Sequence, residues 1–195
     1  MNPFPPLPIV YDPITVTVVS PYPLPYGAVM AIFYMLLLIP TFILIEYLIV
    51  SRAGRISLVL VASVNVLTFI GAEVFSVVVI GYIDPLVIVA LLVIEELLIG
   101  LIESMVYLLS LNEAGLIRSI EDCFRVVWLT VVANYASFAY GVLVYLVYVA
   151  TRMSGLIGDI ATLGVLLAIF TFVIGKAKPL ILGEMDAARA SRVRI

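Results

Sequence analysis

The chain has 195 residues, of which 65% are hydrophobic and 12% are charged, and its formal net charge is -3. A mean hydropathy of +1.28 leaves too little polar surface to cover a water-soluble globule of this size. The sequence contains no histidine, which excludes the histidine-based haem and zinc sites and every Ser-His or Cys-His nucleophile. We therefore predict an all-α integral membrane protein of the cell membrane, multi-pass, that is not an enzyme and has no metal site or cofactor.

The N-terminal segment, residues 1–26, is rich in proline and contains neither lysine nor arginine. Prolines at this density prevent a helix. The missing basic residues exclude a signal peptide with a positively charged start. Residues 14–19, ITVTVV, alternate β-branched positions and favour one short strand. We predict a proline-rich extracytoplasmic segment.

Five apolar stretches follow, and each is long enough to cross a bilayer as a helix. We place these spans at residues 27–50, 56–82, 85–110, 126–150 and 156–175. Between the third and fourth spans, residues 111–125 alternate apolar and charged side chains at helical spacing, which predicts a short helix lying at the membrane interface. The predicted organisation is thus a five-helix transmembrane domain at 27–175 and a basic cytoplasmic tail at 176–195. No internal repeat is visible, and an inverted repeat within part of the chain stays open.

The basic residues indicate the orientation of the spans. Nine of the ten lie on one side of a five-span arrangement, and only Arg152 lies on the other. Because lysine and arginine concentrate in cytoplasmic loops, we predict the N-terminus outside and the C-terminus inside. The clustered arginines of the tail favour binding to anionic lipid headgroups.

The third span carries three glutamates at membrane depth: Glu95, Glu96 and Glu103. A charged residue at the centre of a span costs about 2.5 to 3.5 kcal/mol on insertion scales, so three in one span require a reason. Polar residues also recur at helical spacing in the second and fourth spans, and they include Asn65, Glu73 and Asn134. Counting depth along each span predicts one level that holds Glu73 and Glu96. A second level, about 10 to 12 Å deeper, holds Asn65, Glu103 and Asn134.

These three spans contain no lysine or arginine, so their carboxyls must be protonated, hydrated or bound to a cation. The sequence therefore predicts a protein that handles cations, with the proton preferred. The candidate ion or proton path consists of Glu73, Glu96, Glu103, Glu95, Asn65 and Asn134. Glu46 is instead expected at the inner interface, paired with Arg52 or Arg55.

Two other interpretations remain open at this stage. Small and polar residues at helix contacts also serve as ordinary membrane glue. A chain this small, with no soluble domain, also fits a non-catalytic accessory or scaffold subunit of a larger multi-subunit membrane complex. The expected partners are the lipid bilayer, other membrane subunits or a second copy of the chain, and a cation or proton. Nothing in the sequence indicates nucleic-acid binding.

Overall fold

The computed structural model describes the backbone of residues 24–79, 85–151 and 156–192. Apart from the connections at 51–57 and 114–119, these ranges are helical, and they contain no strand. The five helices are α1 (Leu24–Val50), α2 (Leu58–Val79), α3 (Pro85–Glu113), α4 (Ile120–Thr151) and α5 (Leu156–Arg192). The predicted all-α class is confirmed for this part of the chain, whereas the strand expected at 14–19 lies outside the described residues.

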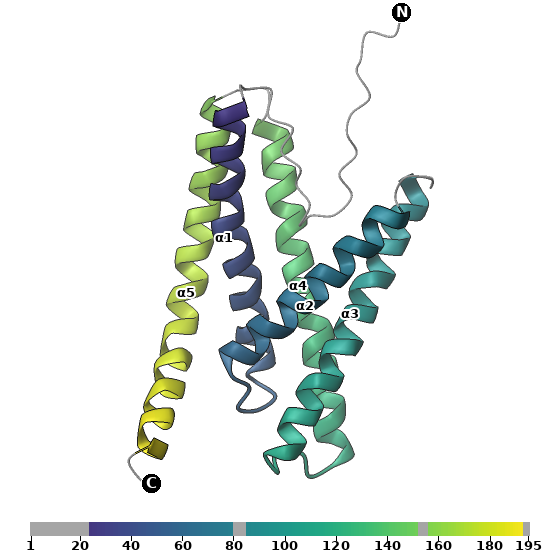
Figure 1. Cartoon of the computed structure of the whole chain (residues 1–195), viewed down its shortest axis with the longest axis vertical. Helices are drawn as coiled ribbons and strands as arrows, with labels where there is room; N and C mark the ends of the chain where they lie inside the picture. Colours follow the sequence, from purple (N-terminus) through teal and green to yellow (C-terminus); the bar gives the residue numbers. More distant parts are fainter. Residues whose placement is uncertain (1–23, 80–84, 152–155, 193–195) are drawn as a thin grey trace, which may run out of the picture.

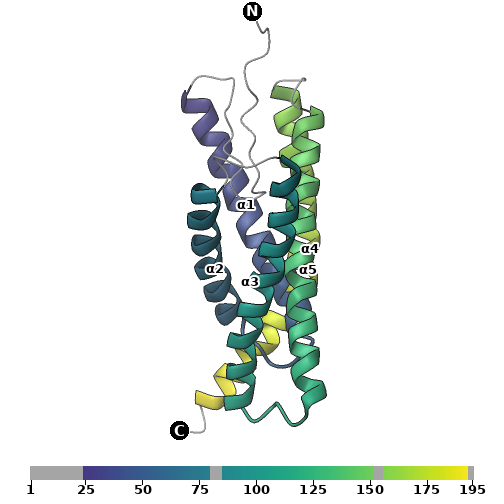
Figure 2. The same cartoon turned by 90° about the vertical axis from the view of Figure 1, so that its right-hand side faces the viewer.

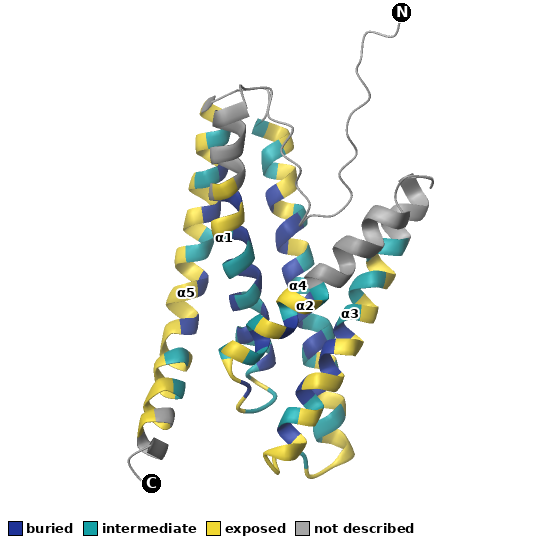
Figure 3. Ribbon diagram, viewed as in Figure 1, coloured by how far each residue is buried: buried dark blue, intermediate teal, exposed yellow. Residues whose placement is uncertain are grey.

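Two of the helices are long and apolar enough to cross a membrane, α4 over Ile120–Thr151 and α5 over Ile157–Ala187. Many large apolar side chains are also exposed, and Figure 3 shows exposed positions along the helices. Val59, for example, is 74% exposed and Leu67 is 70% exposed. Soluble monomers rarely expose apolar surface on this scale. Both observations support membrane association.

The helices form two groups that meet at one end of the molecule. α1 packs against α4 and α5, while α3 packs along α4 (Figures 1 and 2). In Figure 1, α2 and α3 lean away from the other three helices toward the top. The α1–α2 connection at 51–57, the α3–α4 connection at 114–119 and the end of α5 all lie toward the bottom, which we call the turn end.

The α3–α4 connection differs from the prediction. Gly115, with φ 67°, takes the left-handed conformation that ends a helix, and the N–H of Leu116 donates to the carbonyl of Leu111 at 2.9 Å. Four residues later, the Ser119 hydroxyl accepts from the N–H of Asp122 at 3.2 Å, and the Asp122 carboxylate accepts from the N–H of Ser119 at 2.9 Å. This reciprocal cap starts α4.

The separate interfacial helix predicted at 111–125 is therefore wrong. α3 continues to Glu113, and α4 already begins at Ile120. The amphipathic spacing of these residues is real, but it belongs to the ends of two long helices. A helix stop at Gly115 and a helix start at Ser119 leave no room for a third element.

α5 continues as one helix of 37 residues, past the expected end of the fifth span at 175 and through Pro179. At 1.5 Å per residue it is about 55 Å long, well beyond the ~30 Å hydrocarbon core of a bilayer. Val173 and Ala177 are buried against the other helices. The described part of the basic tail is thus a helical extension that brings Glu184 to the start of α2.

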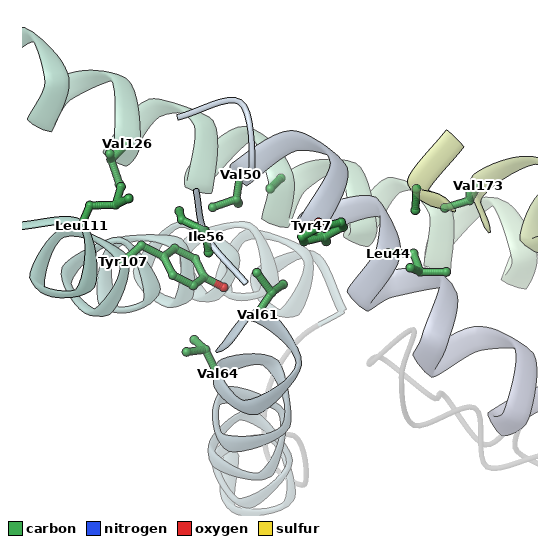
Figure 4. Packing of buried hydrophobic residues seen from close by; sticks show 12 residues of the cluster. Leu44, Tyr47, Val50, Ile56, Val61, Val64, Tyr107, Leu111, Val126 and Val173 are labelled. Carbon is green, nitrogen blue, oxygen red and sulfur yellow. The ribbon is translucent and has the colours of Figure 1, made fainter. Parts of the chain in front are cut away.

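Two apolar clusters hold the bundle together. The first lies toward the turn end and gathers residues from all five helices, among them Tyr47, Val61, Tyr107 and Val126 (Figure 4). The second joins α1, α4 and α5, where the rings of Phe42 and Tyr140 meet edge to face with centroids 5.4 Å apart. Buried polar residues lie near the boundary between the two clusters: Glu46 on α1, and Asn134 and Ser137 on α4.

Candidate functional site

Two carboxyl groups lie in the interior of the bundle, Glu46 on α1 and Glu103 on α3. Glu46 is 4% exposed and Glu103 is 1% exposed. Each occupies the buried stripe of its helix, because Leu38, Phe42 and Glu46 recur at steps of four and Tyr107 follows Glu103 by the same step. The helical spacing therefore directs both carboxyls inward.

Glu46 receives hydrogen bonds from two helices other than its own. Its Oε2 atom accepts from the side-chain amide of Asn65 on α2. Its Oε1 atom lies 2.8 Å from the hydroxyl oxygen of Ser137 on α4. The expectation that Glu46 reaches the inner interface to pair with Arg52 or Arg55 is therefore wrong. It is a member of the buried site.

Glu103 is bonded in the same manner by the same two helices. Its Oε2 atom accepts from the side-chain amide of Asn134 on α4 at 2.8 Å. Its Oε1 atom lies 2.7 Å from the hydroxyl oxygen of Thr68 on α2. Each carboxyl thus has one amide partner and one hydroxyl partner. We call these six residues the carboxyl pair site: Glu46, Asn65, Thr68, Glu103, Asn134 and Ser137.

The carboxyl pair site contains two buried acids and, among the described residues, no base that contacts them. Glu46 and Glu103 lie within coulombic range of each other, and Glu96 lies within coulombic range of Glu46. In the part of the chain that the structure describes, no lysine or arginine contacts either carboxyl of the pair. Two ionised carboxylates would repel strongly in such a desolvated place.

Tyr107 adds a buried hydroxyl beside the pair. Its side chain is fully buried, and its hydroxyl has no hydrogen-bond partner among the described residues. It interacts electrostatically with both Glu103 and Glu46. In Figure 4 the hydroxyl oxygen of Tyr107 points toward α2, where Val61 is labelled. Buried hydroxyls are seldom left without a partner, so this one is a donor available to the site.

The structure brings together part of the predicted path. Of the three residues expected at one level, Glu103 and Asn134 are hydrogen-bonded to each other, whereas Asn65 bonds Glu46. Glu95 and Glu96 are half-buried, nearer the start of α3. Glu73 is on α2, but its side chain lies outside the described residues, so the upper level of the predicted path stays a prediction.

The sequence did not predict that Glu46, Thr68 and Ser137 belong to one site with Glu103. Helical spacing could have found Glu46, since it lies one turn from Phe42 on a buried face. Thr68 and Ser137 each follow an asparagine of the site by three residues and therefore share its helix face. The carboxyl partners of Thr68 and Ser137 depend on how the helices pack.

The carboxyl, amide and hydroxyl groups of the carboxyl pair site suit a proton better than a metal ion. Metal ions such as Ca²⁺ and Mg²⁺ require several free oxygen ligands, whereas the carboxyl oxygens here are engaged by amide and hydroxyl groups. Among the described residues, no group of three or more acidic or cysteine side chains is placed to hold a metal. The arrangement is chemically suited to holding and exchanging a proton.

Comparison with protein-family models, with curated proteins and with solved structures finds no match to this chain.

Proposed function

We propose that the chain is a five-span helical protein of the cell membrane that handles protons at the paired carboxyls of Glu46 and Glu103. The observation that carries this proposal is the pair itself, 4% and 1% exposed, bonded to neutral groups and contacted by no base in the described residues. A buried carboxyl without a counter-ion is most stable when neutral. Each change of charge at the pair therefore needs a proton to arrive or leave.

The hydrogen bonds explain how the pair can also exist in an ionised form. A hydrogen bond to a charged group contributes about 1.5 to 3 kcal/mol. The amides of Asn65 and Asn134 each place one such donor on a carboxyl. With these donors present, losing one proton from the pair is far less costly than it would be in a purely apolar interior. Both protonation states are then accessible.

The path extends from the pair along α3 in this proposal. Glu96 is seven residues, or roughly 10 Å, from Glu103 toward the start of that helix, and it interacts electrostatically with Glu46. Glu95 and Glu73 are the further carboxyls toward the same end. Asn65 and Asn134 hold the pair in place. Protons reaching Glu96 from the outer side would pass to the pair and leave toward the turn end.

The position of the basic residues supports the membrane orientation, with the N-terminus outside and the C-terminus inside. Arg52 and Arg55 lie in the α1–α2 connection, and Arg118 lies in the α3–α4 connection, both at the turn end. The guanidinium of Arg125 donates to the carbonyl of Arg52 at 2.8 Å, which joins the two connections. Arginines gathered at one end of a bundle favour that end as the cytoplasmic one.

Proton flux into proteoliposomes that contain an internal pH dye tests the proposal. We expect Glu103→Gln and Glu46→Gln each to lower the flux at least about tenfold, because glutamine keeps the shape of the carboxyl but cannot take up or release its proton. The matched control is Glu113→Gln, which changes an exposed carboxyl at the end of the same helix as Glu103. Unchanged flux in both pair variants would end the proposal.

A second candidate function is an accessory subunit of a larger membrane complex. The observation that favours it is the exposure of Ile94, Leu98 and Ile102, which recur at steps of four along α3. Apolar side chains there face either lipid or a neighbouring subunit. Native mass spectrometry after mild solubilisation separates these cases. Foreign subunits that co-purify favour this function, and a lone chain or homo-oligomer speaks against it.

A further inference from the structure

The expectation that the chain shows no internal repeat is wrong for the carboxyl pair site, whose residues occur twice in the chain in the same order. Glu46 and Glu103 each end the tripeptide Leu-Ile-Glu, at 44–46 and 101–103. On the helix that follows, an asparagine precedes a hydroxyl residue by three positions and a phenylalanine by four, in NVLTF at 65–69 and NYASF at 134–138. The α1–α2 hairpin and the α3–α4 hairpin thus each carry one carboxyl, one amide and one hydroxyl.

The hydrogen bonds of the two hairpins follow a crossed pattern. The amide bonds stay within a hairpin, because Asn65 donates to Glu46 and Asn134 donates to Glu103. The hydroxyl contacts run between the hairpins: Thr68 of the first reaches Glu103 of the second. Ser137 of the second reaches Glu46 of the first. Exchanging the two hairpins would leave this pattern unchanged.

The two hairpins differ in length, but the difference keeps the same residues facing each other. α1 ends four residues after Glu46, and α2 begins seven residues before Asn65. In the second hairpin the corresponding distances are ten residues after Glu103 and fourteen residues before Asn134. Both arms are therefore longer by nearly the same amount, about two helical turns. Lengthening antiparallel helices equally moves the turn without separating the facing residues.

Each hydroxyl has only one hydrogen but two or more acceptors, and the Thr68 oxygen also lies 3.2 Å from the carbonyl oxygen of Asn65. The Ser137 oxygen lies 2.8 Å from Glu46 Oε1 and also 2.8 Å from the backbone carbonyl oxygen of Asn134. The Thr68 oxygen lies 2.7 Å from Glu103 Oε1 and 3.0 Å from the carbonyl oxygen of Val64. An ionised carboxylate must receive the hydroxyl hydrogen. A protonated carboxyl donates its own O–H to the hydroxyl oxygen, and the hydroxyl hydrogen then turns to the carbonyl.

Among the described residues, the other ionisable groups that bear on the pair come from α3, whereas Glu184 of α5 is engaged elsewhere. Glu96 and Tyr107 of α3 interact electrostatically with Glu46, and Tyr107 interacts with Glu103 as well. Glu184 of α5 is engaged by Tyr47 and by the start of α2. The contacts from α2 and α4 to the carboxyls are all neutral. The two hydroxyls are therefore the groups whose hydrogen must move when a carboxyl changes charge.

We propose that Thr68 and Ser137 are positioning residues that each control the proton on the carboxyl of the opposite hairpin. This inference rests on the proposed proton handling and specifies how the duplicated site performs it. When Glu103 gains a proton delivered along the path from Glu96, the Thr68 hydrogen moves from Glu103 to the carbonyl of Val64. When that proton leaves, the hydrogen returns. Ser137 does the same for Glu46 with the carbonyl of Asn134.

Infrared difference spectroscopy of the full chain in liposomes, recorded across pH, tests the crossed control. The carboxyl C=O bands are assigned first with Glu46→Gln and Glu103→Gln. We expect Thr68→Val to move the pH midpoint of the Glu103 band by about one unit, a tenfold change in proton affinity. The Glu46 band should move by less than half as much. Ser137→Ala should give the reverse pattern, and Thr68→Ser and Ser137→Thr should restore the original midpoints.

The matched control is Thr130→Val, which removes a buried hydroxyl of α4 whose one partner among the described residues is the carbonyl of Val126, at 2.8 Å. It should leave both carboxyl bands in place. If Thr68→Val does not fold, Thr68→Ala takes its place. A larger shift in the carboxyl of the same hairpin, or no shift in either, overturns the inference. If the crossed pattern is found but the chain shows no proton flux, the inference holds and the transport proposal fails.

Discussion

The two hairpins carry the same polar residues but are held in the bundle by different means. α3 packs closely along α4, and Gly100 makes this possible because a Cβ added there would lie 3.1 Å from the Cα of Val131. The described residues of α2 have fewer contacts with α1 and α3, and α2 leans away from α1 in Figure 1. Residues 58–68 are attached by the hydrogen bonds of Asn65 and Thr68, by Glu184 at the first turn and by an apolar contact at the turn end.

This difference indicates which element responds to a change of charge. The α3–α4 pair is a close-packed support that fixes Glu103 and Asn134. The described part of α2, residues 58–68, is attached in part through groups that contact the two carboxyls, so the protonation of the pair affects its attachment directly. The two hairpins carry the same polar groups, but they are packed to different degrees. We therefore expect α2 to be the helix that moves when the charge of the pair changes. Each variant below tests one side of this comparison.

The largest effect is expected from Gly100→Leu, which attacks the close-packed hairpin. The new side chain would meet the backbone of Val131 and the amide of Asn134, so α3 and α4 must separate. We expect a loss of about 3 kcal/mol in the free energy of unfolding, measured by denaturant titration in micelles. Gly164→Leu on α5 is the control, because no atom lies within 4 Å of a Cβ added there. Similar losses in both variants would show that α3–α4 packing is not special.

A smaller effect is expected from Glu184→Ala, which tests the attachment of α2. The Glu184 carboxylate accepts from the hydroxyl of Tyr47 at 2.8 Å and from the N–H of Leu58, at the start of α2, at 3.3 Å. Losing this cap should destabilise the first turn of α2 by about 1 to 2 kcal/mol. Hydrogen exchange at the α2 amides should then quicken by roughly tenfold while exchange in α4 is unchanged. Asp186→Ala, at an exposed carboxylate on the same helix, is the control.

The smallest effect is expected from Arg125→Met, which removes the link between the turns of the two hairpins. The bond from Arg125 to the carbonyl of Arg52 is exposed, so its loss should cost only about 0.5 kcal/mol. Thermal unfolding in micelles measures it, with Arg118→Met as the matched control. A loss above about 2 kcal/mol would mean that the turn, and not the buried site, holds the hairpins together.

Much of the fold was predictable because apolar length and helix stop signals are local properties. The predicted first span, 27–50, corresponds to α1 (Leu24–Val50), and the predicted third span, 85–110, corresponds to α3 (Pro85–Glu113). The level shared by Glu103 and Asn134 was also predictable, since the rise of a helix is constant. The interfacial helix was not, because an amphipathic pattern at a helix end resembles a separate short helix.

Glu46 was not predicted to belong to the site, because counting depth along each span assumes that every helix runs parallel to the bundle axis. Asn65 is ten residues beyond Arg55 along the chain, whereas Glu46 is only six residues before Arg52. α2 is inclined to α1 (Figure 1), so each of its residues advances less along the bundle axis. Asn65 therefore comes level with Glu46 and bonds it. The repeat of the site was hidden for a related reason, because the two hairpins differ in length.

The amino-acid sequence alone determined that the chain is helical, that it has too little polar surface for water, and that its buried acids have no base on their own helices. These properties depend on composition and on local periodicity. Only the packing of the helices decided which acids meet, because the tilt of α2 and the close approach of α3 to α4 set the distances between side chains far apart in the chain. The pairing of Glu46 with Glu103, and the crossed bonds around them, follow from those distances.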